Sequence, residues 1–445
     1  MVKLAGTINR LSCRNILVIG DLMLDTYTIG KARRISPEAP VAVLQVLREE
    51  NRPGGAGNVV LNLVSLGAEV VLLGRIGKDP AGQMLHDALS AEKVDVRGLF
   101  IQNNFSTPMK NRIIADNQQI VRVDYEQITA LPENLEQQMI DSLPQLMDGV
   151  SAIAISDYGK GLLSRKLLSA IIQEAKIRGL PVVTDPKGID FTKYSGTTII
   201  KPNLSEAYAA AGVLPDTDLD IAAPKILEAS NANMLMVTRS EAGISIFHRH
   251  GERHDFPVKV REIKDVTGAG DTVLAMLTYA TANGLDIAQA AQLSNVAAGI
   301  AIERFGCARV TLSEIAWRLL ESDVANKVFD EEHLMTLCEA LKGKRYCVLG
   351  LSGARGMTSS IFSSIHKLAK TQERDLVIYL MDPIPDLDFV NLLASIQDVK
   401  FIILQSDNVT TLCDTIKPDG IYAIVDKELF PLSSPLELIS EAEKE

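Results

Sequence analysis

Cysteine and histidine are scarce in this chain, which has five cysteines and six histidines among 445 residues. No two cysteines form a Cys-x-x-Cys pair, and they form no cluster with histidine. Zinc sites and disulfide frameworks need such residues at close, regular spacings. We therefore expect buried thiols, with neither disulfide bonds nor zinc, at Cys13, Cys307, Cys338, Cys347 and Cys413.

Excess positive charge and long apolar runs are also missing. The formal net charge is −11 and the isoelectric point is about 5.2, which argues against binding to nucleic acid or to an anionic membrane. No apolar run reaches the roughly 18 residues that a membrane-spanning helix needs. Residues 1–24 lack the cleavage pattern of a signal peptide, because their apolar part runs directly into Gly20 and Asp21. We expect a cytoplasmic protein with small-molecule partners, and neither nucleic acid nor membrane.

Hydrophobic residues make up 47% of the chain, which is enough for two or more packed domains. Short apolar runs alternate with segments of helical length. This alternation predicts an α/β fold, with helices on both faces of a doubly wound parallel sheet. The predicted strands are residues 15–20, 70–75, 152–156, 182–185, 198–200 and 234–238.

Other segments are rich in β-forming residues but do not alternate with helical patterns. They predict a small antiparallel accessory sheet, made of residues 41–46, 109–114 and 119–124.

One small-residue motif, Asp265-Val266-Thr267-Gly268-Ala269-Gly270-Asp271-Thr272, leads into a predicted buried helix at residues 272–280. Its glycines let backbone N–H groups converge on an anion, and the positive end of the helix dipole adds to the attraction for phosphate. Asp271 is suited to orient and deprotonate an attacking hydroxyl in phosphoryl transfer. Alternatively, Asp271 is simply an N-cap that accepts backbone hydrogen bonds.

A second glycine-rich segment, Pro53-Gly54-Gly55-Ala56-Gly57-Asn58, lies near the start of the chain. Together the two motifs resemble the signatures of the ribokinase-like (PfkB) family of sugar kinases, an early Gly-Gly segment with a following Asn and a late Asp-x-x-Gly-Ala-Gly-Asp. The resemblance runs from about residue 10 to about residue 320. Further segments are similar to the D-glycero-D-manno-heptose 7-phosphate kinase branch, namely residues 19–25, 34–41, 156–161, 185–188 and 202–206.

The resemblance implies a ribokinase-like fold whose small β lid covers the sugar and commonly pairs with its twin in a homodimer. It also implies ATP- and Mg²⁺-dependent phosphorylation of the anomeric hydroxyl of the heptose 7-phosphate. The product would be the 1,7-bisphosphate for ADP-heptose and lipopolysaccharide precursor synthesis. The alternatives are a ribokinase-like kinase for another sugar or sugar phosphate, and a catalytically silent sugar-phosphate sensor. The intact Asp271 argues against the sensor.

The resemblance assigns the general base to Asp271 and the anion hole to Gly268, Ala269 and Gly270. Contacts to the sugar are expected from Asp21, Gly54, Gly55 and Asn58. Asp21 follows a predicted core strand, and a carboxylate and an amide can bridge neighbouring hydroxyls. A cation is needed for the existing 7-phosphate, and the spacing does not rank the candidates, which are Arg33, Arg34, Lys110, Arg112, Lys160 and Lys187.

The nucleotide residues also follow from the resemblance. Asn203, Leu204, Ser205 and Glu206 match an Asn-x-x-Glu segment that organises Mg²⁺, with Glu206 expected to hold the metal through water. Thr238, Ser240 and Gly243 follow a predicted strand and should border the nucleotide, and Asn295 matches a base-pocket position. The alternative for Asn295 is a helix residue that faces solvent.

A break in the pattern follows residue 311, where a charged helical stretch through residues 326–338 leads into a new strand at residues 346–349. We predict a kinase domain at residues 1–325, a linker at 326–341 and a smaller α/β domain at 342–445. The further strands expected in the smaller domain are residues 375–381, 399–404 and 420–425.

Bifunctional members of the resembled heptose branch carry a nucleotidyltransferase domain at this place, and it depends on a His-x-Gly-His motif after the first strand. Residues 350–360 of this chain contain neither histidine. We therefore expect a degenerate nucleotidyltransferase-like domain without transferase activity. The alternative is a repurposed nucleotide or regulatory site that uses Gly353, Arg355, Gly356 and Ser359.

Overall fold

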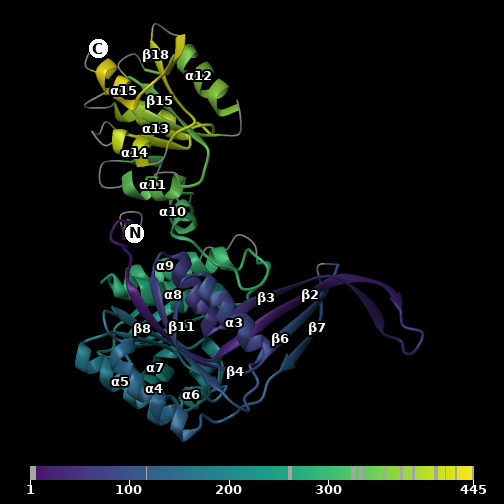
Figure 1. Cartoon of the computed structure of the whole chain (residues 1–445). Coiled ribbons are helices and arrows are strands. Elements are labelled where there is room, and N and C mark those ends of the chain that lie inside the picture. Colours follow the sequence, from purple (N-terminus) through teal and green to yellow (C-terminus); the bar gives the residue numbers. More distant parts are fainter. Residues whose placement is uncertain are drawn as a thin grey trace. The chain divides into compact units, whose positions relative to one another are not determined.

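The computed structural model describes residues 7–116, 118–258, 263–321, 327–329, 334–353, 356–370, 374–382, 386–404, 409–415, 417–425 and 428–442. It divides the chain into a large unit, Ser12–Thr311, and a small unit, which combines Met1–Leu11 with Leu312–Glu445 (Figure 1). This division falls before the boundary that the sequence places after residue 325. The reason is that α10 (Leu312–Glu321) packs on α11 (Leu334–Leu341) in the core of the small unit, through Ala316 and Leu320.

The large unit is built on a nine-stranded sheet with the order β13-β12-β11-β10-β9-β8-β1-β4-β5. The strands from β11 to β5 are parallel, and β12 and β13 add an antiparallel edge. The predicted parallel α/β sheet is confirmed, and β5, β12 and β13 are additional to the strands expected from the sequence. The strands are β1 (Asn15–Gly20), β4 (Glu69–Gly77), β5 (Asp95–Gln102), β8 (Ala152–Ser156), β9 (Val182–Asp185), β10 (Ile199–Ile200), β11 (Met234–Thr238), β12 (Ile244–His248) and β13 (Arg253–Phe256).

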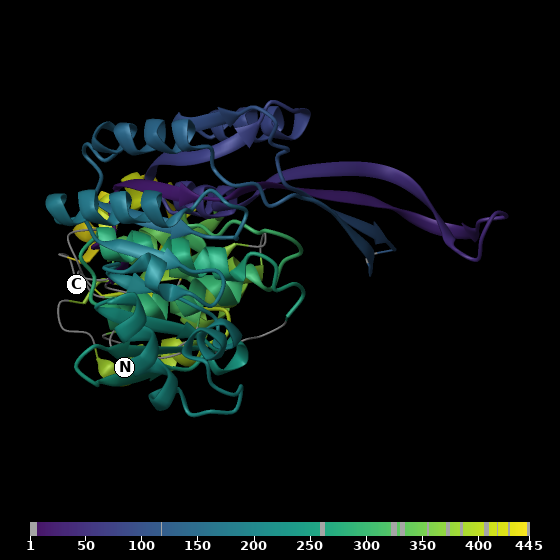
Figure 2. The same cartoon turned by 90° about the horizontal axis from the view of Figure 1, so that it is seen from below.

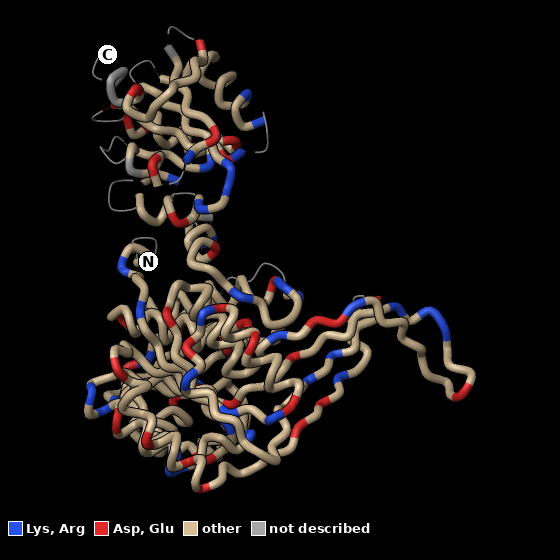
Figure 3. The backbone as a smooth tube through the Cα atoms, in the orientation of Figure 1, with Lys and Arg blue, Asp and Glu red and all other residues tan. Residues whose placement is uncertain are grey.

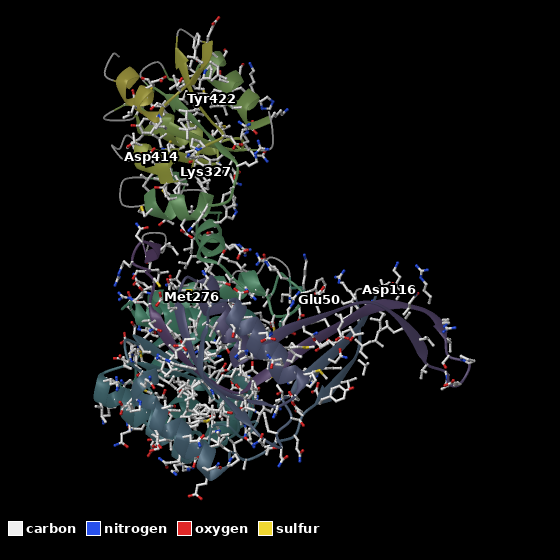
Figure 4. The ribbon with its side chains drawn as sticks, viewed as in Figure 1. Glu50, Asp116, Met276, Lys327, Asp414 and Tyr422 are labelled. Atoms are coloured by element: carbon white, nitrogen blue, oxygen red, sulfur yellow. The ribbon has the colours of Figure 1, made fainter. Side chains whose placement is uncertain are left out.

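Helices cover both faces of this sheet, because its central strands are apolar on both sides. On one face, Leu17 and Ile19 of β1 share a core with α4 (Glu133–Leu146), α5 (Arg165–Arg178), α6 (Leu204–Ala211) and α7 (Leu219–Ser230). The other face carries α2 (Ala56–Ser65), α3 (Pro80–Ala91), α8 (Ala269–Ala282) and α9 (Ile287–Ala301). Figure 4 shows Met276 of α8 within the large unit, where it is fully buried.

The accessory sheet has four strands in the order β3-β2-β6-β7: β2 (Leu22–Ile35), β3 (Ala42–Gly55), β6 (Met109–Ala115) and β7 (Gln118–Tyr125). The prediction of a purely antiparallel sheet is wrong at one place, since β2 and β6 are parallel. The chain passes through β3, α2, β4, α3 and β5 between these two strands, and such a long crossover permits parallel pairing. We call this sheet the lid.

The lid ends in a ribbon of only two strands. β6 pairs with β2 from Leu24 to Gly30, and beyond Gly30 only β2 and β3 continue, as far as the pair Ile35 and Ala42. This ribbon extends away from the body of the large unit (Figure 2). Both signs of charge occur along it (Figure 3).

The small unit contains a six-stranded sheet that is parallel except for its edge pair β18 and β19. β14 lies inside the stretch predicted to be helical at residues 326–338, so that prediction is wrong there: Val328 and Phe329 pair with β17. The strands, in sheet order, are β14 (Val328–Phe329), β17 (Phe401–Ile403), β16 (Asp375–Leu380), β15 (Tyr346–Leu351), β18 (Gly420–Val425) and β19 (Glu428–Leu432). Its other helices are α12 (Ser359–Lys370), α13 (Leu387–Ser395), α14 (Val409–Thr415) and α15 (Pro435–Ala442).

The beginning of the chain belongs to this small unit. Thr336 of α11 donates a hydrogen bond from its hydroxyl to Asn9 Oδ1, at 3.0 Å, and Ile8 is buried. The large unit is therefore inserted, in sequence, between two pieces of the small one.

All five cysteines are free thiols, and four of them are buried. Cys13 is exposed, so the prediction of a buried thiol is wrong there, because Cys13 lies in the irregular segment just before β1. No helix within the described ranges is both long and apolar enough to cross a bilayer.

Candidate active site

Asp271 lies in the first turn of α8 and is 3% exposed. Asn58 Nδ2 donates a hydrogen bond to Asp271 Oδ2 at 2.8 Å, and the Tyr158 hydroxyl donates to Oδ1 at 2.7 Å. The N-cap position belongs to Gly268, with no side-chain cap. The alternative reading of Asp271 as an N-cap therefore does not describe this carboxylate.

Burial raises the pKa of Asp271 from 3.8 to about 7, because desolvation disfavours the charged form. The hydrogen bonds from Asn58 and Tyr158 lower this pKa, Asp185 raises it and Lys201 lowers it. Burial and the nearby Asp271 hold the pKa of the Tyr158 phenol well above its ordinary value, so this hydroxyl keeps its proton and acts as the donor. A carboxylate that titrates near neutral pH is suited to general-base catalysis.

Asn58 stands in the first turn of α2 with a fixed side-chain orientation. Asn62 Nδ2 donates to Asn58 Oδ1 at 3.2 Å, which turns the amide NH₂ of Asn58 toward Asp271. Gly268 has φ +79°, and a Cβ at this position would lie 2.7 Å from Asn58 Nδ2. A side chain at position 268 would therefore break the contact between Asn58 and Asp271.

Asp21 follows β1 directly and is buried. Its Oδ2 accepts hydrogen bonds from the backbone N–H groups of Tyr158 and Lys160, each at 3.0 Å. Burial raises the pKa of Asp21, and these hydrogen bonds act against that rise. Asp21 thus fixes the loop that carries Tyr158 to Asp271.

Gly54 and Gly55 end β3, directly before α2. A Cβ on Gly54 would lie 2.0 Å from Asp25 Oδ2, and Gly55 has φ +59°. Asp25 Oδ1 in turn accepts a hydrogen bond from Arg112 Nη1 at 2.5 Å. Gly54 therefore lets the buried Asp25–Arg112 pair of the lid approach the end of β3, next to α2.

The loop before α8 contributes to two cavities, each of about 500 Å³. Asp265 lines the first cavity together with Tyr27 and Arg112 of the lid, while Ala269 and Gly270 line the second. The first cavity also holds Arg48, Arg52, Lys264 and Gly306. The structure therefore offers space for two ligands on one glycine-rich loop.

The second cavity brings together most residues expected at the nucleotide: Asn203, Thr238, Ser240, Gly243 and Asn295. Its apolar wall includes Val266, Val273 and Ile302. Asn295 is 8% exposed and its Nδ2 donates to the carbonyl oxygen of Phe256 at 2.8 Å, so it does not face solvent. Leu204 packs against the core of the large unit, and Ser205 Oγ donates to Asn203 Oδ1 at 2.7 Å.

Both carboxylate oxygens of Glu206 accept hydrogen bonds. Oε2 accepts from the Asn203 N–H at 3.1 Å, within a capping box that starts α6, and Oε1 accepts from Lys187 Nζ at 2.7 Å. Lys187, a candidate for the sugar phosphate, therefore lies beside the segment expected at the nucleotide.

The other candidate cations are distributed over the lid and the loop after β8. Arg112 lines the first cavity, and Lys110 lies opposite Asp25 on β6. Lys160 Nζ pairs with Glu126 at 2.7 Å. Arg33 and Arg34 are exposed near the distal end of β2.

Tyr158, Asp185 and Lys201 were not among the site residues expected from the sequence. Lys201 Nζ pairs with Asp185 Oδ2 at 2.9 Å, and a Cβ on Gly270 would lie 3.8 Å from that Nζ. Burial raises the pKa of Asp185 to about 6, against the effect of Lys201. Their places along the sequence could have indicated Asp185 and Lys201 as site residues. Asp185 ends β9, Lys201 follows β10, and ligands bind at the carboxyl ends of parallel strands.

The nine-stranded sheet, the lid and the buried carboxylate behind a glycine-rich loop define a ribokinase-like enzyme. The pfkB family carbohydrate kinase model matches residues 14–314, and the chain belongs to this family. It is therefore a carbohydrate kinase.

Similar proteins agree with this assignment. The chain is 45% identical over 343 residues to a bifunctional protein HldE of Pelobacter propionicus, covering 76% of this chain and 70% of that protein. It is 39% identical over 422 residues to a bifunctional protein HldE of Geobacter metallireducens, covering 91% and 86%.

Solved structures support the fold. Ribokinase of Arabidopsis thaliana, complexed with ribose and ATP, superposes with a TM-score of 0.55 at 17% identity, covering 69% of this chain and 99% of that one. Phosphofructokinase-2 of Escherichia coli, in complex with potassium, gives 0.58 at 18% identity, covering 70% and 99%.

Proposed function

We propose that this kinase transfers the γ-phosphate of ATP to the anomeric hydroxyl of D-glycero-D-manno-heptose 7-phosphate in the cytoplasm. The product is the 1,7-bisphosphate for ADP-heptose and lipopolysaccharide precursor synthesis. The main observation in support of phosphoryl transfer is Asp271, a buried carboxylate that hydrogen bonds from Asn58 and Tyr158 hold at the start of α8. The heptose-branch motifs and the relatives named HldE support the choice of sugar.

In this mechanism Asp271 accepts the proton of the anomeric hydroxyl while the hydroxyl oxygen attacks the γ-phosphorus of ATP. The bond between the γ-phosphorus and the β,γ-bridging oxygen breaks, and ADP leaves. Asn58 and Tyr158 keep the carboxylate in position. The backbone N–H groups of residues 268–270, at the positive end of α8, stabilise the charge on the transferred phosphoryl group. Lys201, beside Gly270, adds a positive charge close to this loop.

The residues of the second cavity fit ATP and Mg²⁺. The apolar wall suits the base, and Asn203, Thr238 and Ser240 offer polar contacts. Two carboxylates lie beside lining residues of this cavity: Glu206 next to Asn203, and Asp185 next to Gly270. Carboxylates are hard oxygen ligands that suit Mg²⁺, which keeps several of its waters. Bound Mg²⁺ would neutralise phosphate charge.

The first cavity fits the sugar phosphate. Arg112, Arg48 and Arg52 line it, and guanidinium groups bind phosphate through paired hydrogen bonds. We place the 7-phosphate at this cluster and the anomeric end near Asp271. Asp21, Gly54, Gly55 and Asn58 then form the base of the sugar site.

The test is ATP consumption by the purified protein with a panel of sugar phosphates, and phosphorus NMR of each product. A new anomeric phosphate on the heptose 7-phosphate is the expected result. Turnover with a different sugar only would support the kinase activity and rule out the heptose 7-phosphate as the substrate. No turnover with any sugar would favour the silent sensor.

We further propose that the small unit has lost nucleotidyl transfer. Ser352 Oγ and the Gly353 N–H donate to the two oxygens of Asp382, at 2.8 and 2.6 Å, within residues 350–360, where the resemblance to bifunctional members of the heptose branch leads us to expect two histidines. Arg355, named for the alternative regulatory site, lies outside the described residues. Release of pyrophosphate from ATP with heptose 1-phosphate would refute the proposal.

We also propose a homodimer through the lid. An isolated two-stranded ribbon is marginally stable in water. Val46, opposite Gly30 where the ribbon begins, is 54% exposed, and Leu47, the next residue toward the body of the large unit, is 60% exposed. Leu47 is left without a pairing partner at a register shift between the pairs Ile29–Arg48 and Gly30–Val46. A second copy of the ribbon would supply the missing strands and cover these side chains.

A further inference from the structure

The hairpin of β12 and β13 carries three metal-binding side chains on one face. Ile246 pairs with His254, and the His248 N–H donates to the Glu252 carbonyl oxygen at 2.8 Å, so His248 lies opposite Glu252. Glu252 and His254 are two residues apart, and such side chains share a face. The ligand atoms of His248, Glu252 and His254 all lie within 4.8 Å of one another.

Arg253, the basic residue between Glu252 and His254, points to the opposite face of the hairpin. Arg253 lies over the ring of Phe247 and pairs with Asp218, Asp220 and Asp255, at 3.1 to 3.4 Å. Its charge is thereby neutralised away from the cluster. Glu252 Oε1 instead contacts His254 Nε2, at 2.8 Å.

We propose that His248, Glu252 and His254 form a binding site for a divalent transition-metal ion of the Zn²⁺ type. Two imidazoles and one carboxylate are a ligand set that zinc accepts, with water in the fourth position. Tetrahedral bonds of about 2.0–2.2 Å place ligand atoms roughly 3.4 Å apart. Glu252 Oε1 and His254 Nε2 lie closer than this, at 2.8 Å, and all three ligand atoms lie within 4.8 Å of one another. Glu252 and His254 are exposed, so side-chain rotations can adjust these spacings.

This site is separate from the second cavity, which we propose for ATP and Mg²⁺. Ile244, at the other end of β12, lines the nucleotide cavity. At about 3.3 Å per residue, His248 lies roughly 13 Å further along the strand. Nitrogen ligands also favour zinc over Mg²⁺, so the two metals can be studied independently.

The test is calorimetric titration of the full-length protein with Zn²⁺, without nucleotide or Mg²⁺. We expect the unchanged protein to bind one Zn²⁺ per chain. The Kd should be roughly tenfold higher or more in His248→Gln and in His254→Gln, since the loss of a ligand costs at least as much as the loss of an outer-shell partner. His86→Gln changes an exposed histidine on α3 and should bind Zn²⁺ as the unchanged protein does.

Three results would overturn the site, two of them seen without any change at Cys13. One is the absence of saturable Zn²⁺ binding, and the other is binding that His248→Gln and His254→Gln leave unchanged. Binding that disappears in Cys13→Ser would assign the ion to the exposed thiol and would also overturn it. Circular dichroism of each metal-free variant separates loss of a ligand from loss of the fold.

Discussion

At the scale of single residues, Asp271 is the group on which the proposed chemistry depends. Asp271→Asn keeps the size of the side chain but cannot accept the proton. We expect kcat to fall by a factor of roughly 10² to 10⁴, with ATP and sugar binding retained. Steady-state kinetics measure this, and Asp87→Asn, an exposed aspartate on α3, is the matched control. Near-normal turnover of Asp271→Asn would refute the base assignment.

Tyr158 controls the pH at which that base works. The pKa of Asp271 is about 7, and the base must be ionised, so kcat should rise with pH through this value. Tyr158→Phe removes a hydrogen bond that lowers the pKa of Asp271, so the rise in kcat should move to higher pH. Tyr125→Phe, on the exposed end of β7, should leave the pH profile of kcat in place. An unmoved profile in Tyr158→Phe would contradict this role.

The raised pKa also has a cost in stability. The folded state holds the proton of Asp271 up to about pH 7, whereas an accessible aspartate has a pKa of 3.8. The unfolded state therefore binds fewer protons between these values, and the free energy of unfolding falls as pH rises through them, by up to roughly 4 kcal/mol. Asp271→Asn removes this fall. The free energy of unfolding of the variant, measured by urea denaturation, should therefore exceed that of the unchanged protein by an amount that grows from pH 4 to pH 8. A constant difference would show that Asp271 is ionised throughout.

Sequence reasoning found the residues whose signal is local. Asp271 and Gly268 lie in one motif, and Asp21 follows an apolar strand. Tyr158 was missed because its partner Asp271 is 113 residues away, and no local pattern encodes a contact of that kind. Asn203 and Glu206 show that a local motif can also have a structural role, since the Asn-x-x-Glu spacing forms a helix capping box.

At the scale of elements, the sequence predicted the core strands well and the lid poorly. β1, β8, β9 and β11 were predicted with the bounds that the structure gives, because buried parallel strands are continuous apolar runs. β3 was predicted only up to Val46. Residues 47–52 are mostly charged or polar, without an apolar alternation, since none of them is buried within one chain.

The exposed ribbon gives a prediction about assembly. Leu47→Lys places a charge beside the start of the ribbon, at an exposed apolar side chain that a second lid would cover, so the weight-average mass in analytical ultracentrifugation should fall from dimer toward monomer. Ile177→Lys, at an exposed position on α5, is the matched control and should leave the mass unchanged. A monomer before any substitution, or a dimer that Leu47→Lys leaves intact, would exclude this interface. Figure 4 shows Glu50 on the same strand, nearer the body of the large unit.

At the scale of the whole molecule, the two units have separate cores. Calorimetry should show two unfolding transitions. ATP with Mg²⁺ should raise only the transition of the large unit, by about 2.7 kcal/mol at a hundredfold excess over Kd. Deletion of residues 1–11 should lower the other transition, because Asn9 and Ile8 belong to the small unit. One transition that ATP shifts as a whole would contradict this division.

The place of the first residues in the small unit also sets an order of events during synthesis on the ribosome. Asn9 and its partner Thr336 are 327 residues apart. At roughly 5–20 residues per second, the amino-terminal segment waits roughly 16–65 s for that partner to be translated. The large unit can complete its own sheet in that interval, so the nascent chain folds from its middle outward and joins its two ends last.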